Sequence, residues 1–137
     1  MDRIPHVFTI SEVVQKTLYD NYGVESTVVC NGIVTSCFVS RPKTMPKGQL
    51  RVVMVSRLEH DKKGQDLLIR AAAALQGTVT VDFIGIGSSM EYLKQLTAEL
   101  HAETYVHFLG KQTQDYVAAH LTDYDLFVQP SVGKVSA

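Results

Sequence analysis

From residue 50 onward, short apolar runs alternate with stretches in which apolar residues recur every three or four positions. The apolar runs predict four buried strands, at residues 51–55, 79–84, 105–108 and 125–128. The recurring patterns predict three helices, at residues 65–76, about 89–102 and 112–121. Strict alternation of apolar strands with helices predicts an α/β fold, a doubly wound, Rossmann-like parallel sheet with helices on both faces.

The helical spacing also predicts which side chains face the core. In helix 65–76 the expected inward residues are Leu67, Leu68, Ala71, Ala72 and Leu75. In the helix at 89–102 they are Met90, Leu93, Leu96 and Leu100.

The first 49 residues follow a less regular pattern. Strands are expected at 7–10 and 27–30, the second of which ends at the turn pair Asn31–Gly32. Between them, Ser11 is expected to cap a helix that stops at Gly23, and its expected inward residues are Val13, Val14, Leu18 and Tyr22. Residues 39–49 contain two prolines, a glycine and several basic residues, which is typical of a linker. The expected division is therefore 1–38, a linker at 39–49, and a sheet domain at 50–137.

Composition narrows the function classes. The 137 residues are 45% hydrophobic and 20% charged, which suits about one globular domain with a real core. The net charge of −1 argues against a nucleic-acid surface. No apolar run approaches the roughly 18 residues of a membrane span. Cys30 and Cys37 have neither metal nor redox spacing, and the five histidines show no paired ligand spacing, so no zinc site is expected.

Basic residues and a glycine lie between the first strand and the first helix of this alternation. Arg57 follows strand 51–55, and Lys63–Gly64 directly precedes helix 65–76. Fixed cations beside the positive end of a helix dipole form a common phosphate site. The alternative is a pair of solvated basic residues in a polar loop.

Six segments occur in the order and at the spacing of one known family. They are Phe8–Glu12, Val28–Ile33, Ser56–Gly64, Asp82–Gly87, Val106–Gly110 and Asp125–Ser131. Together they resemble the retaining GT-B glycosyltransferases of family 4, also called glycosyl transferases group 1. In that family the Ser-Arg-Leu…Lys-Gly turn holds the donor diphosphate.

The resemblance implies a role for each candidate residue. Arg57 and Lys63 would bind the donor diphosphate, and Lys62 is the less favoured partner because the family places glycine directly after its lysine. Gly85, Gly87, Pro130 and Ser131 would form the wall of the donor site. Leu109, Gly110 and Lys111 would line the base pocket. Ordinary turn chemistry is the alternative for each glycine.

Two further patterns weigh against other ligands. A dinucleotide fingerprint needs another glycine at position 90, where Met90 stands, so NAD is not expected. Asp123-Tyr124-Asp125 has a metal–diphosphate form, but it precedes a strand and so lies away from the carboxyl end of that strand. No metal or other cofactor is expected.

The departures from the family pattern suggest a truncated C-terminal donor-binding domain. Val34 stands where the family usually has Asp, Ile86 replaces a polar residue, and the two-glutamate motif expected after Ser131 is not in the chain. Residues 1–38 would be the end of the N-terminal domain and the interdomain passage, and 50–137 an incomplete nucleotide-sugar-binding domain. This chain alone is expected to be inactive. It is also expected to self-associate through its exposed apolar face and sheet edge, or to cover them with the 1–38 segment.

For the intact protein, the resemblance implies transfer of a hexose-type sugar from a nucleotide-diphosphate sugar to a glycan or lipid-linked acceptor. It would work in the cytoplasm or at the cytoplasmic face of the membrane, in polysaccharide biosynthesis. Two alternatives stay open, namely a nucleotide-sugar epimerase or other GT-B-like enzyme, and a binding-only doubly wound domain. A two-glutamate motif downstream of Ser131 would favour the transferase.

Overall fold

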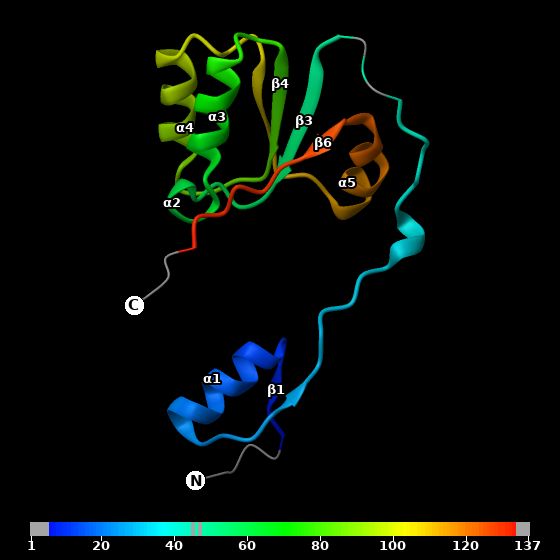
Figure 1. The fold of residues 1–137 in the computed structure, drawn as a ribbon, viewed down its shortest axis with the longest axis vertical. Coiled ribbons are helices and arrows are strands. Elements are labelled where there is room, and N and C mark those ends of the chain that lie inside the picture. The colour runs from blue at the N-terminus through cyan, green and yellow to red at the C-terminus, as the bar shows by residue number, and fades with distance from the viewer. Residues whose placement is uncertain (1–5, 45, 47, 134–137) are drawn as a thin grey trace. The chain divides into compact units, whose positions relative to one another are not determined.

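The computed structural model describes residues 6–44, 46 and 48–133, and the chain divides into two compact units, Met1–Thr35 and Ser36–Ala137 (Figure 1). The second unit contains a four-stranded sheet of β3 (Leu50–Val55), β4 (Val79–Ile84), β5 (Val106–Gly110) and β6 (Leu126–Phe127). All neighbouring strands are parallel, in the order β5-β4-β3-β6. The chain steps outward from β3 to β5 and then returns to place β6 on the other side of β3. The topological switch point, where such sheets bind ligands, therefore lies between β3 and β6.

Helices cover both faces of this sheet, which confirms the doubly wound fold (Figure 1). Helices α3 (Gln65–Ala74) and α4 (Met90–Glu99) pack on one face, and α5 (Gln114–His120) packs on the other. The short helix α2 (His60–Lys63) directly precedes α3, and the 3₁₀ turn η2 (Leu121–Asp123) joins α5 to β6. The predicted strands and helices thus all form, with ends that shift by a few residues.

The core under α3 and α4 contains the largest buried side chains of the sheet. Phe83 and Met54 are fully buried there, and the Phe83 ring stacks on Phe108 with centroids 5.4 Å apart. The inward face predicted for α4 is confirmed, because its leucines and Met90 belong to this core. Members of the core contributed by α4 and its flank are Met90, Leu93, Leu96 and Leu100.

The face predicted for α3 is partly wrong. Leu67 and Leu75 are about half exposed, at 50% and 51%, and Ala71 is exposed as well. The buried stripe instead runs through Gln65, Ile69 and Ala72, which follow the i, i+4, i+7 spacing of one helical face. Apolar residues surround almost the whole of this helix, so the sequence pattern alone did not select a single face.

A polar network occupies the α5 side of the sheet. The Tyr124 hydroxyl donates a 2.7 Å hydrogen bond to Asp82, and His107 Nδ1 lies 2.8 Å from the other oxygen of the same carboxylate. The Arg51 guanidinium lies 4.9 Å from the centroid of the Tyr124 ring. Burial, together with the Asp82 carboxylate, raises the pKa of Tyr124 above its ordinary value. This network fixes η2 and the start of β6 to the middle of the sheet.

The first unit is small. Strand β1 (Phe8–Thr9) pairs in parallel with β2 (Thr27–Val28), and α1 (Glu12–Tyr22) connects them. Ser11 caps α1 as predicted, since its Oγ accepts a 3.3 Å hydrogen bond from the Val14 amide. Gly23 ends the helix in the left-handed conformation, with φ 64°.

The inward face predicted for α1 is wrong. The helix has no buried residue, and the exposed fractions are 75% for both Val13 and Tyr22 and 43% for Val14. Leu18 is only half-buried. Two strands of two residues and one helix cannot enclose an apolar face. Residues 29–34 are irregular, so the turn predicted at Asn31–Gly32 is not formed, because no strand of this unit follows to pair back.

The passage that leads into the sheet is held by basic side chains. Its described residues contain one 3₁₀ turn, η1 (Thr35–Cys37), and are otherwise irregular. Lys43 Nζ donates 2.5 Å hydrogen bonds to the carbonyl oxygens of Thr122 and Tyr124, and Arg41 pairs with Asp123 at 3.8 Å. A lysine beside the last carbonyls of a helical turn satisfies acceptors that the turn leaves open. Within the described part of the chain, no helix is both long and apolar enough to cross a membrane.

Candidate functional site

Three loops meet at the carboxyl edge of the sheet and share backbone hydrogen bonds. The Ser56 amide donates to Ile84 O at 3.0 Å, and the Leu58 amide donates to Ile86 O at 3.1 Å. The Gly85 amide donates to Gly110 O at 2.8 Å. The loops that follow β3, β4 and β5 therefore form one connected surface at the end of the strands.

Glycines allow this close contact. At Gly85, where φ is 140°, a Cβ would lie 1.9 Å from Ser56 O, and at Gly87 a Cβ would lie 2.3 Å from Leu58 O. Both distances are shorter than any real carbon–oxygen contact, so a side chain cannot enter without moving the neighbouring loop. The contacts between loops thus require both glycines, whatever ligand approaches them.

The segment that follows β6 runs to the junction of α2 and α3 (Figure 1). Gly64 has the left-handed conformation, φ 71°, and a Cβ there would lie 2.3 Å from Pro130 O. The Val132 amide donates a 3.0 Å hydrogen bond to Lys62 O. Two segments predicted separately from the sequence, Lys63–Gly64 and Pro130–Ser131, are therefore side by side.

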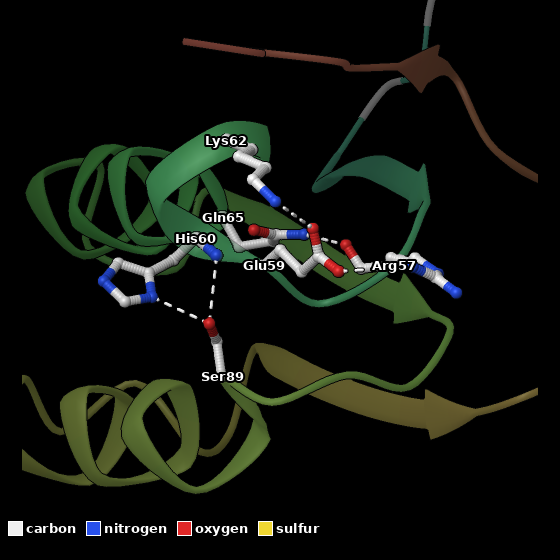
Figure 2. A network of polar contacts seen from close by, with 6 residues as sticks. All are labelled: Arg57, Glu59, His60, Lys62, Gln65 and Ser89. Carbon is white, nitrogen blue, oxygen red and sulfur yellow. Dashed lines mark hydrogen bonds and ion pairs between the residues drawn. The ribbon is translucent and has the colours of Figure 1, made fainter. Parts of the chain in front are cut away.

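The cations of the turn meet at Glu59 (Figure 2). Arg57 Nη1 lies 3.4 Å from Glu59 Oε1, and Lys62 Nζ lies 3.3 Å from Glu59 Oε2. The Arg57 side chain is 81% exposed, so its guanidinium is open to a ligand. Lys63 is half-buried and is the last residue of α2, directly before Gly64. No pattern in the sequence singled out Glu59.

Gln65 links the turn to the helix that follows it. Its side chain is fully buried, and its Nε2 donates to Arg57 O at 2.7 Å (Figure 2). The same Nε2 donates to Ser56 Oγ at 3.1 Å. Its Oε1 has no hydrogen-bond partner among the described residues. Gln65 is also the first residue of α3, whose N-cap, Gly64, carries no side chain to accept from the free amides. Sequence patterns missed Gln65 because a lone glutamine after a glycine is ordinary surface composition.

A second tie holds α2 against α4. Ser89 Oγ accepts a 3.1 Å hydrogen bond from the His60 amide and lies 2.8 Å from His60 Nδ1 (Figure 2). The His60 ring also contacts the Tyr92 ring, with centroids 4.3 Å apart. Together with Gln65, this tie fixes the backbone that presents Arg57 and the two lysines.

A cavity of about 330 Å³ opens beside the turn. Three residues predicted for the donor site line this cavity. They are Arg57 from the expected diphosphate site, Gly85 from the expected donor wall and Lys111 from the expected base pocket. Leu109 instead packs against the core under α5, and Gly110 contributes its carbonyl to the Gly85 amide. The other lining residues are Val55, Ser56, Ile84, Ile86, Gln112 and Val117.

The Asp-Tyr-Asp segment lies at the opposite edge of the sheet. Asp125 accepts a 2.8 Å hydrogen bond from the Arg51 amide near the start of β3, and Asp123 lies 2.9 Å from His120 Nδ1. The hydrogen bond between Asp123 and His120 is the main reason why the pKa of Asp123 lies below its ordinary value. Both carboxylates therefore have protein partners away from the cavity. Among the described residues, no three His, Cys, Asp or Glu side chains are grouped to hold a metal ion.

The sequence of this chain matches a known protein family. The family model described as "Glycosyl transferases group 1" matches residues 38–133. The chain therefore belongs to the glycosyl transferases group 1 family. It is 33% identical, over 104 residues, to the Escherichia coli K-12 protein WcaL, whose name assigns it provisionally as a colanic acid biosynthesis glycosyltransferase.

Solved structures show the same fold. The structure of HepE from Anabaena in complex with UDP and glucose superposes with a TM-score of 0.74 at 26% identity, over 92% of this chain. The lipopolysaccharide outer core galactosyltransferase WaaB, in its apo form, superposes with a TM-score of 0.69 at 21% identity. The chain spans 25% of the length of WcaL, 38% of HepE and 36% of WaaB, so it matches only part of each relative.

Proposed function

We propose that the carboxyl edge of this sheet binds the diphosphate of a nucleotide sugar, and that the intact protein transfers the sugar to an acceptor. Family membership and the UDP and glucose in the HepE structure support this proposal. The observation that carries it is the exposed Arg57 at one cavity, with Gln65, the first residue of α3, hydrogen-bonded to the Arg57 carbonyl. Lys63 and Gly64 directly precede Gln65. Fixed cations and free helix amides suit an anion that gains charge as a glycosidic bond breaks.

The proposed roles are those that the family pattern implies for these residues. Arg57 presents a planar fork to phosphate oxygens, and Lys63 adds a point charge. Gly85, Gly87, Pro130 and Ser131 form the proposed wall of the donor site. Lys111 and its neighbours Leu109 and Gly110 are the proposed base pocket, with Lys111 contributing a cavity-lining side chain.

The finer assignments are proposals of the same kind. They are retention of anomeric configuration, a hexose as the sugar, a glycan or lipid-linked acceptor, no metal or other cofactor, and action in the cytoplasm or at its membrane face. WcaL supports a polysaccharide pathway through its name. This chain is proposed to be inactive by itself, because groups that face the sugar from elsewhere in a transferase act together with the diphosphate site rather than additively.

Calorimetric titration of UDP, GDP and ADP tests the diphosphate site. We expect Arg57→Ala and Lys63→Ala each to weaken binding of the preferred nucleotide by about 10- to 100-fold, since a charge-assisted hydrogen bond is worth roughly 1.5–3 kcal/mol. Arg70→Ala removes the same charge from an exposed position within α3 and should change affinity less than twofold. Equal affinity in all four proteins would contradict the proposal.

Self-association of this chain is a separate proposal. The edge strand β6 exposes Leu126 and Phe127 at 48% and 55%, and an unpaired apolar edge is a template for another chain. We expect the mean mass measured by light scattering to rise with protein concentration. A monodisperse monomer at every concentration would contradict this.

A further inference from the structure

Glu59 lies between two cations of the proposed diphosphate turn, and each of its carboxylate oxygens contacts a different one (Figure 2). We propose that Glu59 is a built-in competing anion, which holds Arg57 and Lys62 in the ligand-free protein and lowers the affinity of the turn for diphosphate. This inference rests on the proposed function, because it assigns an affinity-setting residue to the same site.

The geometry separates Glu59 from an ordinary surface carboxylate. Its side chain is 23% exposed, whereas those of Arg57 and Lys62 are 81% and 69% exposed. It stands at the N-cap position of α2, where an acidic side chain would normally accept from the first amides, yet it makes no capping hydrogen bond. Both oxygens are instead engaged by the cations, at 3.4 and 3.3 Å.

The spacing of these contacts resembles that of a bound phosphate. One anion bridges a guanidinium and an ammonium, which is the arrangement that two phosphoryl oxygens would adopt there. A diphosphate that binds Arg57 must displace the carboxylate or accept its repulsion, and both lower the affinity. The displacement is feasible because both cations are largely exposed, and ion pairs to exposed cations are individually weak.

Lys63 has a different position in this scheme. No ion pair to Lys63 occurs among the described residues, whereas Lys62 is held by Glu59. Lys63 is therefore available to an incoming phosphate without any exchange of partners. Arg57 is the cation whose partner must change, so the effect of Glu59 should depend on Arg57.

The test compares Glu59→Gln with Asp61→Asn by calorimetric titration of inorganic pyrophosphate and of UDP. Glu59→Gln keeps the shape of the side chain and removes its charge. Asp61→Asn removes the same charge from an exposed residue of the same short helix that makes none of the ion pairs found in the described residues. We expect Glu59→Gln to tighten pyrophosphate binding roughly 3- to 10-fold, and Asp61→Asn to change it less than twofold.

A second comparison locates the effect. In an Arg57→Ala background, Glu59→Gln should give a smaller gain than in the wild-type chain, because one of the two displaced contacts is already missing. Circular dichroism spectra and melting temperatures of all variants exclude a folding defect as the cause.

Each contrary result has a distinct meaning. Unchanged or weaker binding in Glu59→Gln overturns the inference and makes Glu59 a residue that orients the cations. An equal gain in Asp61→Asn also overturns it, since long-range charge would then suffice. If Arg57→Ala and Lys63→Ala abolish binding while Glu59→Gln fails to tighten it, the inference alone fails. If those two alanine variants bind normally, or if neither wild type nor Glu59→Gln binds, the proposed function fails with it.

Discussion

Replacing Gly85 with alanine is expected to destabilise the sheet unit by about 4 kcal/mol. The new Cβ would lie 1.9 Å from Ser56 O, and the backbone φ of 140° is a region that side chains rarely adopt. An unfavourable backbone conformation costs roughly 1–3 kcal/mol and overpacking costs a further 1–3 kcal/mol. The loop after β3 would have to move away from β4, and it carries Arg57 with it.

Gly110→Ala is the matched control for this change. Gly110 also has a positive φ, 69°, but a Cβ there would meet no atom within 4 Å. We therefore expect it to cost only about 1 kcal/mol, the penalty of the left-handed conformation. Denaturant unfolding followed by circular dichroism measures both values. Similar losses in the two variants would show that the contact with Ser56 is relieved easily and does not hold the loops together.

Phe83→Ala is expected to have the second large effect, a loss of about 3–5 kcal/mol. Phe83 is fully buried in β4, stacks on Phe108, and lies in the core that α3 and α4 cover. Its removal leaves a cavity that two helices and three parallel strands cannot readily close. Because folded domains are stable by only about 5–15 kcal/mol, this variant should melt at a much lower temperature.

The control for Phe83 is Phe127, in the edge strand β6. Its side chain is 55% exposed, so Phe127→Ala should cost less than about 1 kcal/mol. Thermal and denaturant unfolding of both variants would show whether the loss of stability comes from the burial of the side chain or from the loss of an aromatic ring as such. Equal destabilisation would mean that β6 is covered in solution, which self-association through that edge would explain.

Most of the fold was predictable because its strands are short apolar runs separated by turns. Strand β4 forms at 79–84 as expected, and the parallel arrangement follows from the alternation with helices. The buried face of α3 was not predictable, since leucine and alanine surround that helix and the buried contact of Gln65 with the turn is not visible in the sequence pattern. The exposed face of α1 was missed for another reason, because an amphipathic pattern does not tell whether a covering layer is present.

The site was predictable to the extent that it depends on residue type and spacing. Arg57 and the Lys63–Gly64 turn follow the strand and precede the helix as expected, and Pro130 lies against Gly64. Glu59 and Gln65 escaped notice because their roles arise from contacts within a tight turn. Gly85 and Gly87 also accommodate the protein's own backbone, a requirement that the sequence pattern does not reveal.

The shared backbone of the three loops limits how such a site can diverge. Gly85 lies against Ser56 of one neighbouring loop and donates a hydrogen bond to Gly110 O of the other. Lengthening any one loop would therefore break backbone contacts with its neighbours. New ligand preferences should therefore come from exchange of outward side chains on a constant frame, such as Ile86, which is 54% exposed at the cavity, or Lys111. A library of variants restricted to those two positions would change ligand recognition without destabilising the sheet.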